Sequence, residues 1–328
     1  MEEKKDCCIL PNKPKEPLPE DCCGSGCSYC VYDVYQIELK KWEFECKRLL
    51  SGGKPSAEKQ LLSQLDFKTF LLIGIYPSAR SINIYRFAIP DSSRINIKPG
   101  QHLMMKGFNS EDKDARVCLT EKDDSPKFEL NYITRPYTVL NTEEDHFDVM
   151  IKLYNNGQMS KYIRKLKVGE EVLWRGPFGD FCHNPSYFGN VTRTLLAFCA
   201  GTGIAPLYGI SKSIVSDEDD ETRIRILWAN HSWDDMPLKG EMKELTSYWN
   251  LSCKLFFSGG LSSVPVGAKT FYELNDGRVN FDAVKMELDS LVDTEIQVLL
   301  CGTKSFEGDM MDYLNTLGVR NSSYHKFT

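Results

Sequence analysis

Four adjacent residues carry the clearest chemistry in the sequence: Arg135, Pro136, Tyr137 and Thr138, within the stretch ITRPYTVLN. The stretch lies between two acidic, turn-rich segments and has the composition of a short β-strand. Successive side chains of a strand point to opposite faces, so the tyrosine ring and the threonine hydroxyl would face opposite sides. A buried arginine beside them would need an anionic partner. Together, these residue types predict a site for a flat, phosphorylated ligand.

A second anion site is predicted in NNGQMSKYI, where Gly157, Gln158, Met159 and Ser160 would lie at a helix N-terminus. Free backbone N–H groups and the helix dipole favour an anion there. Ser160 is the predicted N-cap, and Gly169 is the predicted end of the helix. An ordinary capped helix is the alternative interpretation of the same residues.

Two further sites are predicted at strand ends. In AFCAGTGIAPLYGI, a strand ends at Ala200, residues 201–203 turn tightly, and a helix follows with Pro206 in its first turn. Such a turn lets the backbone approach a dinucleotide pyrophosphate, although the G-x-G-x-x-G pattern is absent from this stretch. In VLLCGT, Cys301 ends a late strand just before Gly302. A cysteine at this position is otherwise a small apolar residue.

The elements that must position these sites differ between the two halves of the chain. From Phe67 to Phe181, short β-like runs such as TFLLIGIYPS, INIYRFAIP and FDVMIKLY are separated by turns, which predicts an antiparallel barrel or sandwich. From Thr192 onward, apolar strands alternate with amphipathic helices. This alternation predicts a parallel sheet covered on both faces, with ligands at the carboxyl ends of the strands.

With a β barrel followed by an α/β domain, residues 66–328 resemble the ferredoxin-reductase superfamily, and within it the NADH-cytochrome b5 reductases. The resemblance implies an FAD-binding barrel and an NAD-binding parallel-sheet domain. It implies that Arg135 binds the flavin pyrophosphate, with Pro136 stiffening the strand. Tyr137 would lie against the flavin ring and ribityl chain, and Thr138 would reach the ring.

The same resemblance implies further flavin contacts, from Met150, Lys152, Asn155, Gly157, Gln158, Met159 and Ser160. The family usually has a lysine where this chain has Gln158, so one cationic contact is missing. The implied nicotinamide contacts are Gly201, Thr202, Gly203, Ile204, Cys301 and Gly302. Of these, Thr202 and Cys301 are the candidate catalytic residues, because in the family the threonine lies beside both rings and the cysteine aligns the nicotinamide.

Two departures from the family pattern concern the nicotinamide dinucleotide. The polar stretch CGTKSFEGDM replaces a proline run, so looser placement of the nicotinamide is expected. Gly259 and Gly260 stand where NADH-selective members have an aspartate, so NADPH is not excluded as a donor.

Seven of the twelve cysteines lie before residue 50, which marks a separate N-terminal module. PLPEDCCGSGCSYCVYDVY resembles an oxidoreductase-like N-terminal domain found on some reductases. Cys22, Cys27 and Cys30 fit the C-x4-C-x2-C spacing of plant-type ferredoxins, with Cys46 as a candidate fourth ligand. A structural zinc site that uses Cys22 or Cys23, and a metal-free docking element, are the alternatives. We assign no metal to the module.

The predicted organisation is a Cys-rich module over residues 1–50, a linker over 51–65, an FAD-binding barrel over 66–185 and an NAD(P)-binding domain over 190–328. The net charge of -6 disfavours a nucleic-acid partner. No apolar run reaches the length of a membrane span, and MEEKKDCCIL lacks the apolar core of a secretory signal. We expect a cytoplasmic, monomeric protein.

The leading functional hypothesis is an FAD-dependent oxidoreductase that passes electrons from NADH to a one-electron acceptor such as cytochrome b5. The stretch SKYIRKLKVG would offer an acidic haem protein a basic face, formed by Lys161, Arg164, Lys165 and Lys167. A solvated helix face is the alternative. Two other functions remain open: a reductase for a quinone or an iron-sulfur protein, and a non-catalytic assembly factor that acts through the cysteine module.

Deletion of residues 1–60 tests whether the cysteine module takes part in electron transfer. We expect the truncated protein still to pass electrons to a one-electron acceptor, because the barrel and the α/β domain contain every predicted electron-transfer element. Steady-state reduction of a haem acceptor by both proteins measures this. Loss of acceptor reduction with flavin reduction intact would instead place the cysteines in the path.

Overall fold

A computed structural model describes residues 61–90, 93, 95–108, 132–183, 193–291, 294–319 and 324–327, together with residues 13, 14, 16, 35, 39, 42 and 46. The chain divides into two compact units, and every element named below belongs to the unit Gln60–Phe327. The candidate metal ligands Cys22, Cys23, Cys27 and Cys30 lie outside the described residues.

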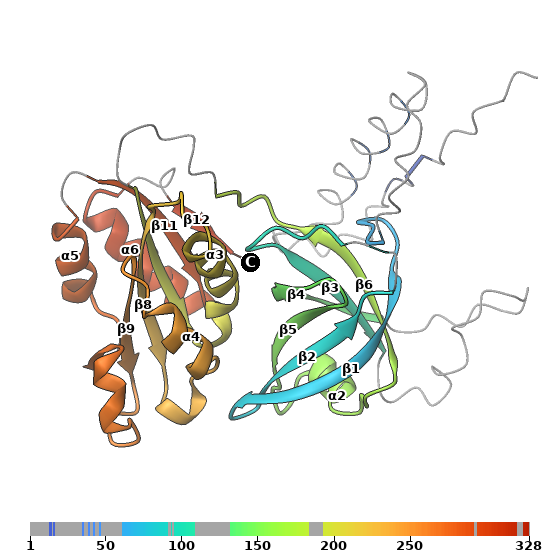
Figure 1. Ribbon diagram of the computed structural model, residues 1–328, viewed down its shortest axis with the longest axis horizontal. Helices are drawn as coiled ribbons and strands as arrows, with labels where there is room; N and C mark the ends of the chain where they lie inside the picture. Colours follow the sequence, from blue (N-terminus) through green and yellow to red (C-terminus); the bar gives the residue numbers. More distant parts are fainter. Residues whose placement is uncertain are drawn as a thin grey trace, which may run out of the picture. The chain divides into compact units, whose positions relative to one another are not determined.

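Six antiparallel strands close into a barrel in the order β1-β2-β5-β4-β3-β6 (Figure 1). Their bounds are β1 Lys68–Ala79, β2 Ile82–Ala88, β3 His102–Phe108, β4 Tyr132–Thr142, β5 His146–Lys152 and β6 Glu171–Phe178. Inward and outward side chains alternate along β1, so Phe70 and Leu72 are buried while Leu71 and Ile73 are exposed. The antiparallel barrel predicted from the sequence is confirmed.

Aromatic side chains fill the interior of the barrel. Phe87 and Phe147 stack with their ring centroids 5.3 Å apart, and Trp174 lies edge-on to both at 5.1 and 5.9 Å. Such contacts stabilise a core beyond the area they bury. Trp174 also lies edge-on to Tyr137 of β4, with the centroids 6.1 Å apart. The barrel core therefore supports the predicted flavin strand from the inside.

Six parallel strands form the second sheet, in the order β10-β9-β8-β7-β11-β12. Their bounds are β7 Arg193–Ala200, β8 Arg223–Asn230, β9 Leu251–Phe257, β10 Glu273–Asp276, β11 Glu295–Cys301 and β12 Tyr324–Lys326. The chain runs outward from β7 to β10 and then returns to the other side of β7 with β11. The carboxyl ends of β7 and β11 therefore form the topological switch point, where open α/β sheets bind their ligands.

Helices cover both faces of this sheet (Figure 1). Their bounds are α3 Ile204–Val215, α4 Lys239–Leu245, α5 Phe281–Asp289 and α6 Lys304–Thr316. Ile226 and Trp228 of β8 lie in one hydrophobic cluster with α3 and α4, whereas Leu227 lies in another with α5 and α6. The parallel sheet with two covered faces is confirmed.

The helix expected from Ser160 to Gly169 is shorter and begins earlier: α2 spans Gln158–Ile163, with Gly157 at its N-cap. The prediction of Ser160 as N-cap is wrong. Its hydroxyl instead accepts the N–H of Tyr154 at 2.9 Å, a backbone donor of the preceding turn. Gly169 has a φ of +96° and lies in a turn beyond the helix, not at its C-cap.

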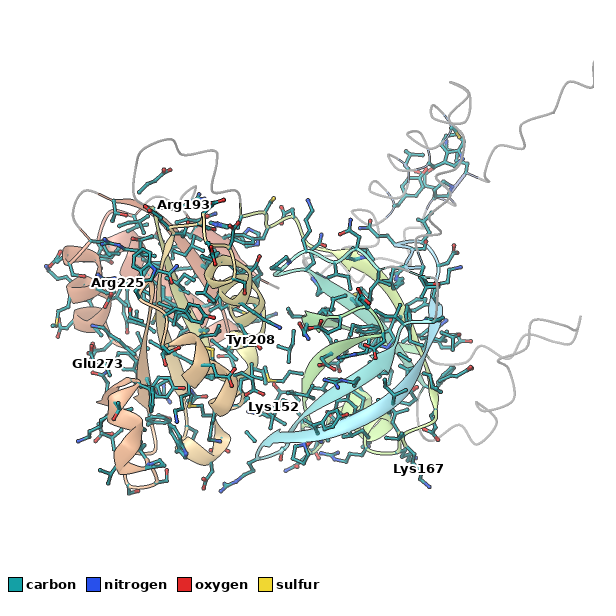
Figure 2. The ribbon with its side chains drawn as sticks, viewed as in Figure 1. Lys152, Lys167, Arg193, Tyr208, Arg225 and Glu273 are labelled. Atoms are coloured by element: carbon teal, nitrogen blue, oxygen red, sulfur yellow. The ribbon has the colours of Figure 1, made fainter. Side chains whose placement is uncertain are left out.

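A buried carboxylate ties α5 to the sheet. Glu287 is only 1% exposed and pairs with Arg225 of β8 at 2.7 Å and Lys254 of β9 at 2.9 Å. Lys254 also lies 3.2 Å from Glu273 of β10, and Figure 2 labels both Arg225 and Glu273. A buried charge without a partner would be costly, so these cations are what allows the carboxylate to lie there.

Substitution Glu287→Ala should lower the free energy of unfolding by about 3 kcal/mol, because it leaves two partly buried cations without their shared carboxylate. Urea unfolding followed by circular dichroism measures the change. Asp289→Ala is the matched control in α5, since its pair with Lys285 is exposed. We expect the control to cost less than about 1 kcal/mol; equal losses for the two variants would contradict this role of the network.

Candidate active site

Arg135 lies on β4 with its side chain exposed. Its guanidinium donates to the carbonyl of Thr134 at 2.8 Å. Within the part of the chain that the structure describes, no carboxylate pairs with it. The expectation of a buried arginine is thus wrong, because the outer side of β4 at this point is open to solvent. The guanidinium keeps donors for an anionic ligand, which fits a pyrophosphate.

Tyr137 and Thr138 are half-buried on the same strand. Burial raises the pKa of the Tyr137 phenol, and the nearby charge of Arg135 lowers it by a smaller amount. The phenol is therefore neutral at physiological pH and can donate a hydrogen bond. Pro136 is exposed, which leaves the aromatic ring and the threonine hydroxyl as the parts of the motif suited to a flat ligand.

His102 lies beside this motif, because β3 pairs it in register with Thr138. Burial lowers the pKa of His102 to about 4, so the ring is neutral. It stacks on Phe178 with the centroids 5.8 Å apart. These features fit a structural role for His102 in the wall of the barrel.

Met150 and Lys152 both point outward from β5, because Val149 and Ile151 between them face the barrel core. Their surroundings differ. Met150 is 5% exposed and lies in a hydrophobic cluster shared with the α/β domain, whereas Lys152, labelled in Figure 2, is exposed. Of the two side chains, only that of Lys152 is accessible to a phosphate.

The start of α2 offers backbone rather than side-chain contacts. No side chain caps the helix at Gly157, so the first N–H groups have no capping partner. The side chain of Met159 is buried in the barrel core, and the Ser160 hydroxyl accepts from Tyr154. Asn155 and Gln158 are exposed. The helix packs against β4, so its open N–H groups and Arg135 come from neighbouring elements.

Residues Gly201–Gly203 form a short 3-10 turn, η3, between β7 and α3. Gly201 has a φ of +53°, a left-handed conformation that glycine adopts without strain. The indole N–H of Trp228, a fully buried residue of β8, donates to the Gly201 carbonyl at 3.0 Å. The turn is therefore held from the neighbouring strand, with Thr202 half-buried at its centre.

The turn meets the end of β11 at Gly203. A Cβ atom at this position would overlap the carbonyl oxygen of Cys301 and lie 2.7 Å from its carbonyl carbon. Only glycine therefore allows the two strand ends to approach so closely. The next residue, Ile204, is fully buried in the sheet core, so only its backbone could contact a ligand.

Cys301 is half-buried at this contact. Burial, with a smaller contribution from the charge of Glu307, raises the pKa of its thiol to about 12. The thiol is protonated at neutral pH, so it can orient a ligand but cannot serve as a thiolate nucleophile. After Gly302, the hydroxyl of Thr303 accepts the N–H of Phe306 at 3.3 Å and caps α6.

Close packing explains Gly259, and backbone conformation explains Gly260, the two glycines that follow β9. The N–H of Gly259 donates to the His231 carbonyl at 2.8 Å, and a Cβ atom there would lie 2.8 Å from that same oxygen. Gly260 has a φ of +87°. The end of β9 is thus a tight turn without an acidic side chain at positions 259 and 260.

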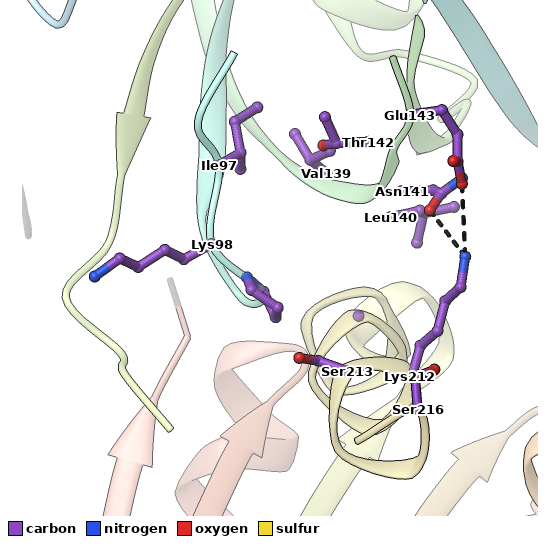
Figure 3. Close-up of a pocket in the computed structure, with 12 residues that line it drawn as sticks. Ile97, Lys98, Val139, Leu140, Asn141, Thr142, Glu143, Lys212, Ser213 and Ser216 are labelled. Atoms are coloured by element: carbon purple, nitrogen blue, oxygen red, sulfur yellow. Dashed lines mark hydrogen bonds and ion pairs between the residues drawn. The ribbon is translucent and has the colours of Figure 1, made fainter. Parts of the chain in front are cut away.

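A cavity of about 330 Å³ lies elsewhere, between the end of β4 and α3 (Figure 3). Residues 97–99 and 139–143 line one side, and Gly209, Lys212, Ser213 and Ser216 line the other. Lys212 donates to the Asn141 side chain at 2.9 Å. None of the site residues predicted from the sequence lines this cavity.

The sequence analysis does not identify two residues that support the turns of the candidate site: Trp228, which donates to the Gly201 carbonyl, and Glu307, which accepts the N–H of Gly302 at 3.0 Å. The first gives no local signal, since it is one apolar residue of a buried strand. The second has a weak signal, an acidic residue in the first turn of a helix that Thr303 caps.

Among the described residues, no group of three or more His, Cys, Asp or Glu side chains could hold a metal ion. Nor does any described helix have the length and apolar character needed to cross a membrane.

Family comparisons agree with the architecture. Residues 75–183 match the oxidoreductase FAD-binding domain, residues 198–312 the oxidoreductase NAD-binding domain, and residues 5–50 the N-terminal domain of oxidoreductase-like proteins. These matches, with the barrel and the parallel sheet, define a flavoprotein reductase that uses FAD and NADH, as predicted.

A mouse protein named NADH-cytochrome b5 reductase-like is 34% identical over 324 residues, covering 96% of this chain and 95% of the relative. The human protein of the same name is 32% identical, with 96% and 94% covered. Arabidopsis thaliana NADH--cytochrome b5 reductase 1 is 27% identical, with 80% and 84% covered. The chain belongs to the family of NADH-cytochrome b5 reductase-like proteins.

Solved structures share the fold. The cytochrome b5 reductase domain of Ulva prolifera nitrate reductase superposes with a TM-score of 0.65 at 20% identity, covering 82% of this chain and all of that domain. The CS-b5R domains of human Ncb5or give a TM-score of 0.62 at 20% identity, with 80% and 69% covered.

Gly203→Ala should separate the turn from the end of β11, because the added methyl group overlaps the Cys301 carbonyl. A displacement on the order of 1 Å can slow the chemistry about a hundredfold, so we expect flavin reduction by NADH to slow by that factor while FAD remains bound. Stopped-flow absorbance measures the rate. Gly308→Ala in α6 is the control, since a Cβ there meets nothing within 4 Å. Wild-type rates in both variants would contradict the role of the contact.

Proposed function

We propose that this chain oxidises NADH and passes the electrons one at a time to a haem protein of the cytochrome b5 type. One observation carries the proposal: the Gly201–Gly203 turn and the Cys301–Gly302 turn meet at the switch point of a dinucleotide-type sheet. A neutral thiol and a threonine at that contact can orient a nicotinamide without reacting with it.

The barrel would hold FAD through the exposed Arg135 guanidinium, the neutral Tyr137 phenol and the open N–H groups of α2. When bound, FAD accepts two electrons from NADH and releases them singly. The protein contributes binding and orientation. Thr202 and Cys301 would fix the nicotinamide side of the same reaction.

Each NADH oxidised to NAD+ supplies two electrons, so two ferric haems become ferrous and one proton is released. The acceptor would dock on the basic segment 161–167, which begins in the last turn of α2; Arg164, Lys165 and Lys167 are exposed, and Lys161 is half-buried. Figure 2 labels Lys167. Clustered cations of this kind favour an acidic partner and speed its association at low salt.

The proposal includes a monomeric state, since one chain contains both halves of the site. Leu140, Met150 and Phe181 of the barrel lie in one hydrophobic cluster with Leu207 and Ile210 of α3. Sedimentation equilibrium, which measures the mass in solution, tests this part.

Stopped-flow mixing tests the function directly. The FAD-loaded protein is reduced with NADH or with NADPH, and is then mixed with ferric cytochrome b5, a quinone or an oxidised iron-sulfur protein. We expect reduction by NADH followed by fast reoxidation by cytochrome b5 that slows as salt rises. If only the quinone or only the iron-sulfur protein reoxidised the flavin, that compound would replace cytochrome b5 as the proposed acceptor. If neither NADH nor NADPH reduced the flavin, the proposal that this chain is an enzyme would be refuted.

Arg135→Ala should yield mostly apoprotein, because a charge-assisted contact to the pyrophosphate is lost and water replaces it poorly. The ratio of flavin absorbance to protein measures FAD content after purification. Arg223→Ala, an exposed arginine at the start of β8, removes the same charge elsewhere and should keep wild-type FAD content. Stoichiometric FAD in the Arg135 variant would refute the assignment of the motif.

A further inference from the structure

Glu307 is a buried carboxylate with both oxygens committed. It lies in the first turn of α6 and is 5% exposed. One oxygen accepts the N–H of Gly302 at 3.0 Å, and the other pairs with Lys326 of β12 at 2.8 Å. The N-terminal end of a helix also favours a negative charge. These contacts hold the Glu307 side chain in one orientation.

The peptide group that Glu307 holds has little freedom. A Cβ atom on Gly302 would lie 2.7 Å from the Phe306 ring and 3.2 Å from Ala200, so the chain passes closely between α6 and the end of β7. The hydrogen bond that the Gly302 N–H donates to Glu307 also fixes the direction in which this N–H points. Cys301, directly before it, contacts Gly203 through its carbonyl group.

Lys326 is itself fixed to the sheet. β12 pairs Lys326 in register with Leu300 of β11, and the N–H of Phe327 donates to the Leu300 carbonyl at 2.9 Å. An unbroken series of contacts therefore runs from the C-terminal strand through Glu307 to the cysteine turn. The turn has polar residues where the resembling family has prolines, so hydrogen bonds must supply the rigidity.

We propose that Glu307 is a positioning residue for NADH oxidation: with Lys326, it holds the Cys301–Gly302 turn in the orientation that places the nicotinamide. The inference rests on the proposed function. A carboxylate that only capped α6 would stabilise the helix and could still influence the Cys301 thiol through its charge, but it would leave kcat for NADH unchanged.

The Cys301 thiol gives a readout that needs no turnover. Removing the negative charge in Glu307→Gln should lower the pKa of Cys301 and speed its alkylation, because less repulsion opposes the thiolate. Lys326→Met should act in the opposite direction, since it leaves the carboxylate charge uncompensated. Loosening of the fold would speed alkylation in both variants, so opposite signs identify the electrostatic coupling.

The experiment measures alkylation of Cys301 by iodoacetamide in the FAD-loaded full chain across pH, with the peptide quantified by mass spectrometry. The same variants are assayed for kcat and KM with NADH. We expect Glu307→Gln to alkylate faster and to lower kcat roughly tenfold, and Lys326→Met to alkylate more slowly. Asp309→Asn, an exposed acidic residue of α6, should match the wild type in both assays.

Wild-type kcat and an unshifted alkylation profile in Glu307→Gln would overturn the inference, as would faster alkylation in both Glu307→Gln and Lys326→Met. If the wild-type protein itself fails to oxidise NADH, the proposed function falls. Opposite shifts in the alkylation of Cys301 would still establish the contact between Glu307 and the cysteine turn. The role of Glu307 in positioning the nicotinamide would be refuted together with the proposed function.

Discussion

The close approach of the Gly203 backbone to the Cys301 carbonyl is the constraint on which the rest of the site depends. It exists because β7 and β11 are neighbours in the sheet although about a hundred residues separate them, and because position 203 has no side chain. Trp228 holds one side of the contact and Glu307 the other. If the ends of β7 and β11 form the nicotinamide site, as we propose, the turns that follow both strands must be held at a fixed distance from each other.

The side of the site that we propose for the flavin depends on a different kind of support. Its strand, β4, is backed by Trp174 within the barrel, while Arg135 remains outside with its donors open. Met150 and Leu140 join the barrel to the sheet domain through a shared apolar core. This shared core brings β4 of the barrel into contact with α3 of the sheet domain.

Local sequence pattern predicts much of this fold and where the chain turns at the candidate site. Short β-like runs separated by turns predict the barrel, and apolar strands that alternate with amphipathic helices predict the parallel sheet with its two helical layers. Glycines at the strand ends predict the turns after β7 and β11. β10 and β12 are too short for any pattern to show. The local pattern does not encode long-range contacts or solvent exposure. It therefore missed the exposure of Arg135, the hydrogen bond from the Tyr154 N–H to the Ser160 hydroxyl, and the hydrogen bonds that support the turns at Gly201 and Gly302.

A crystal structure of the FAD-loaded chain with NAD+ would test the central claim most directly. The expected result is a nicotinamide ring beside the flavin, bounded by Thr202 and Cys301, with its pyrophosphate against the Gly201–Gly203 turn. A dinucleotide bound away from the ends of β7 and β11, for example in the cavity beside Lys212, would contradict the assignment of the active site.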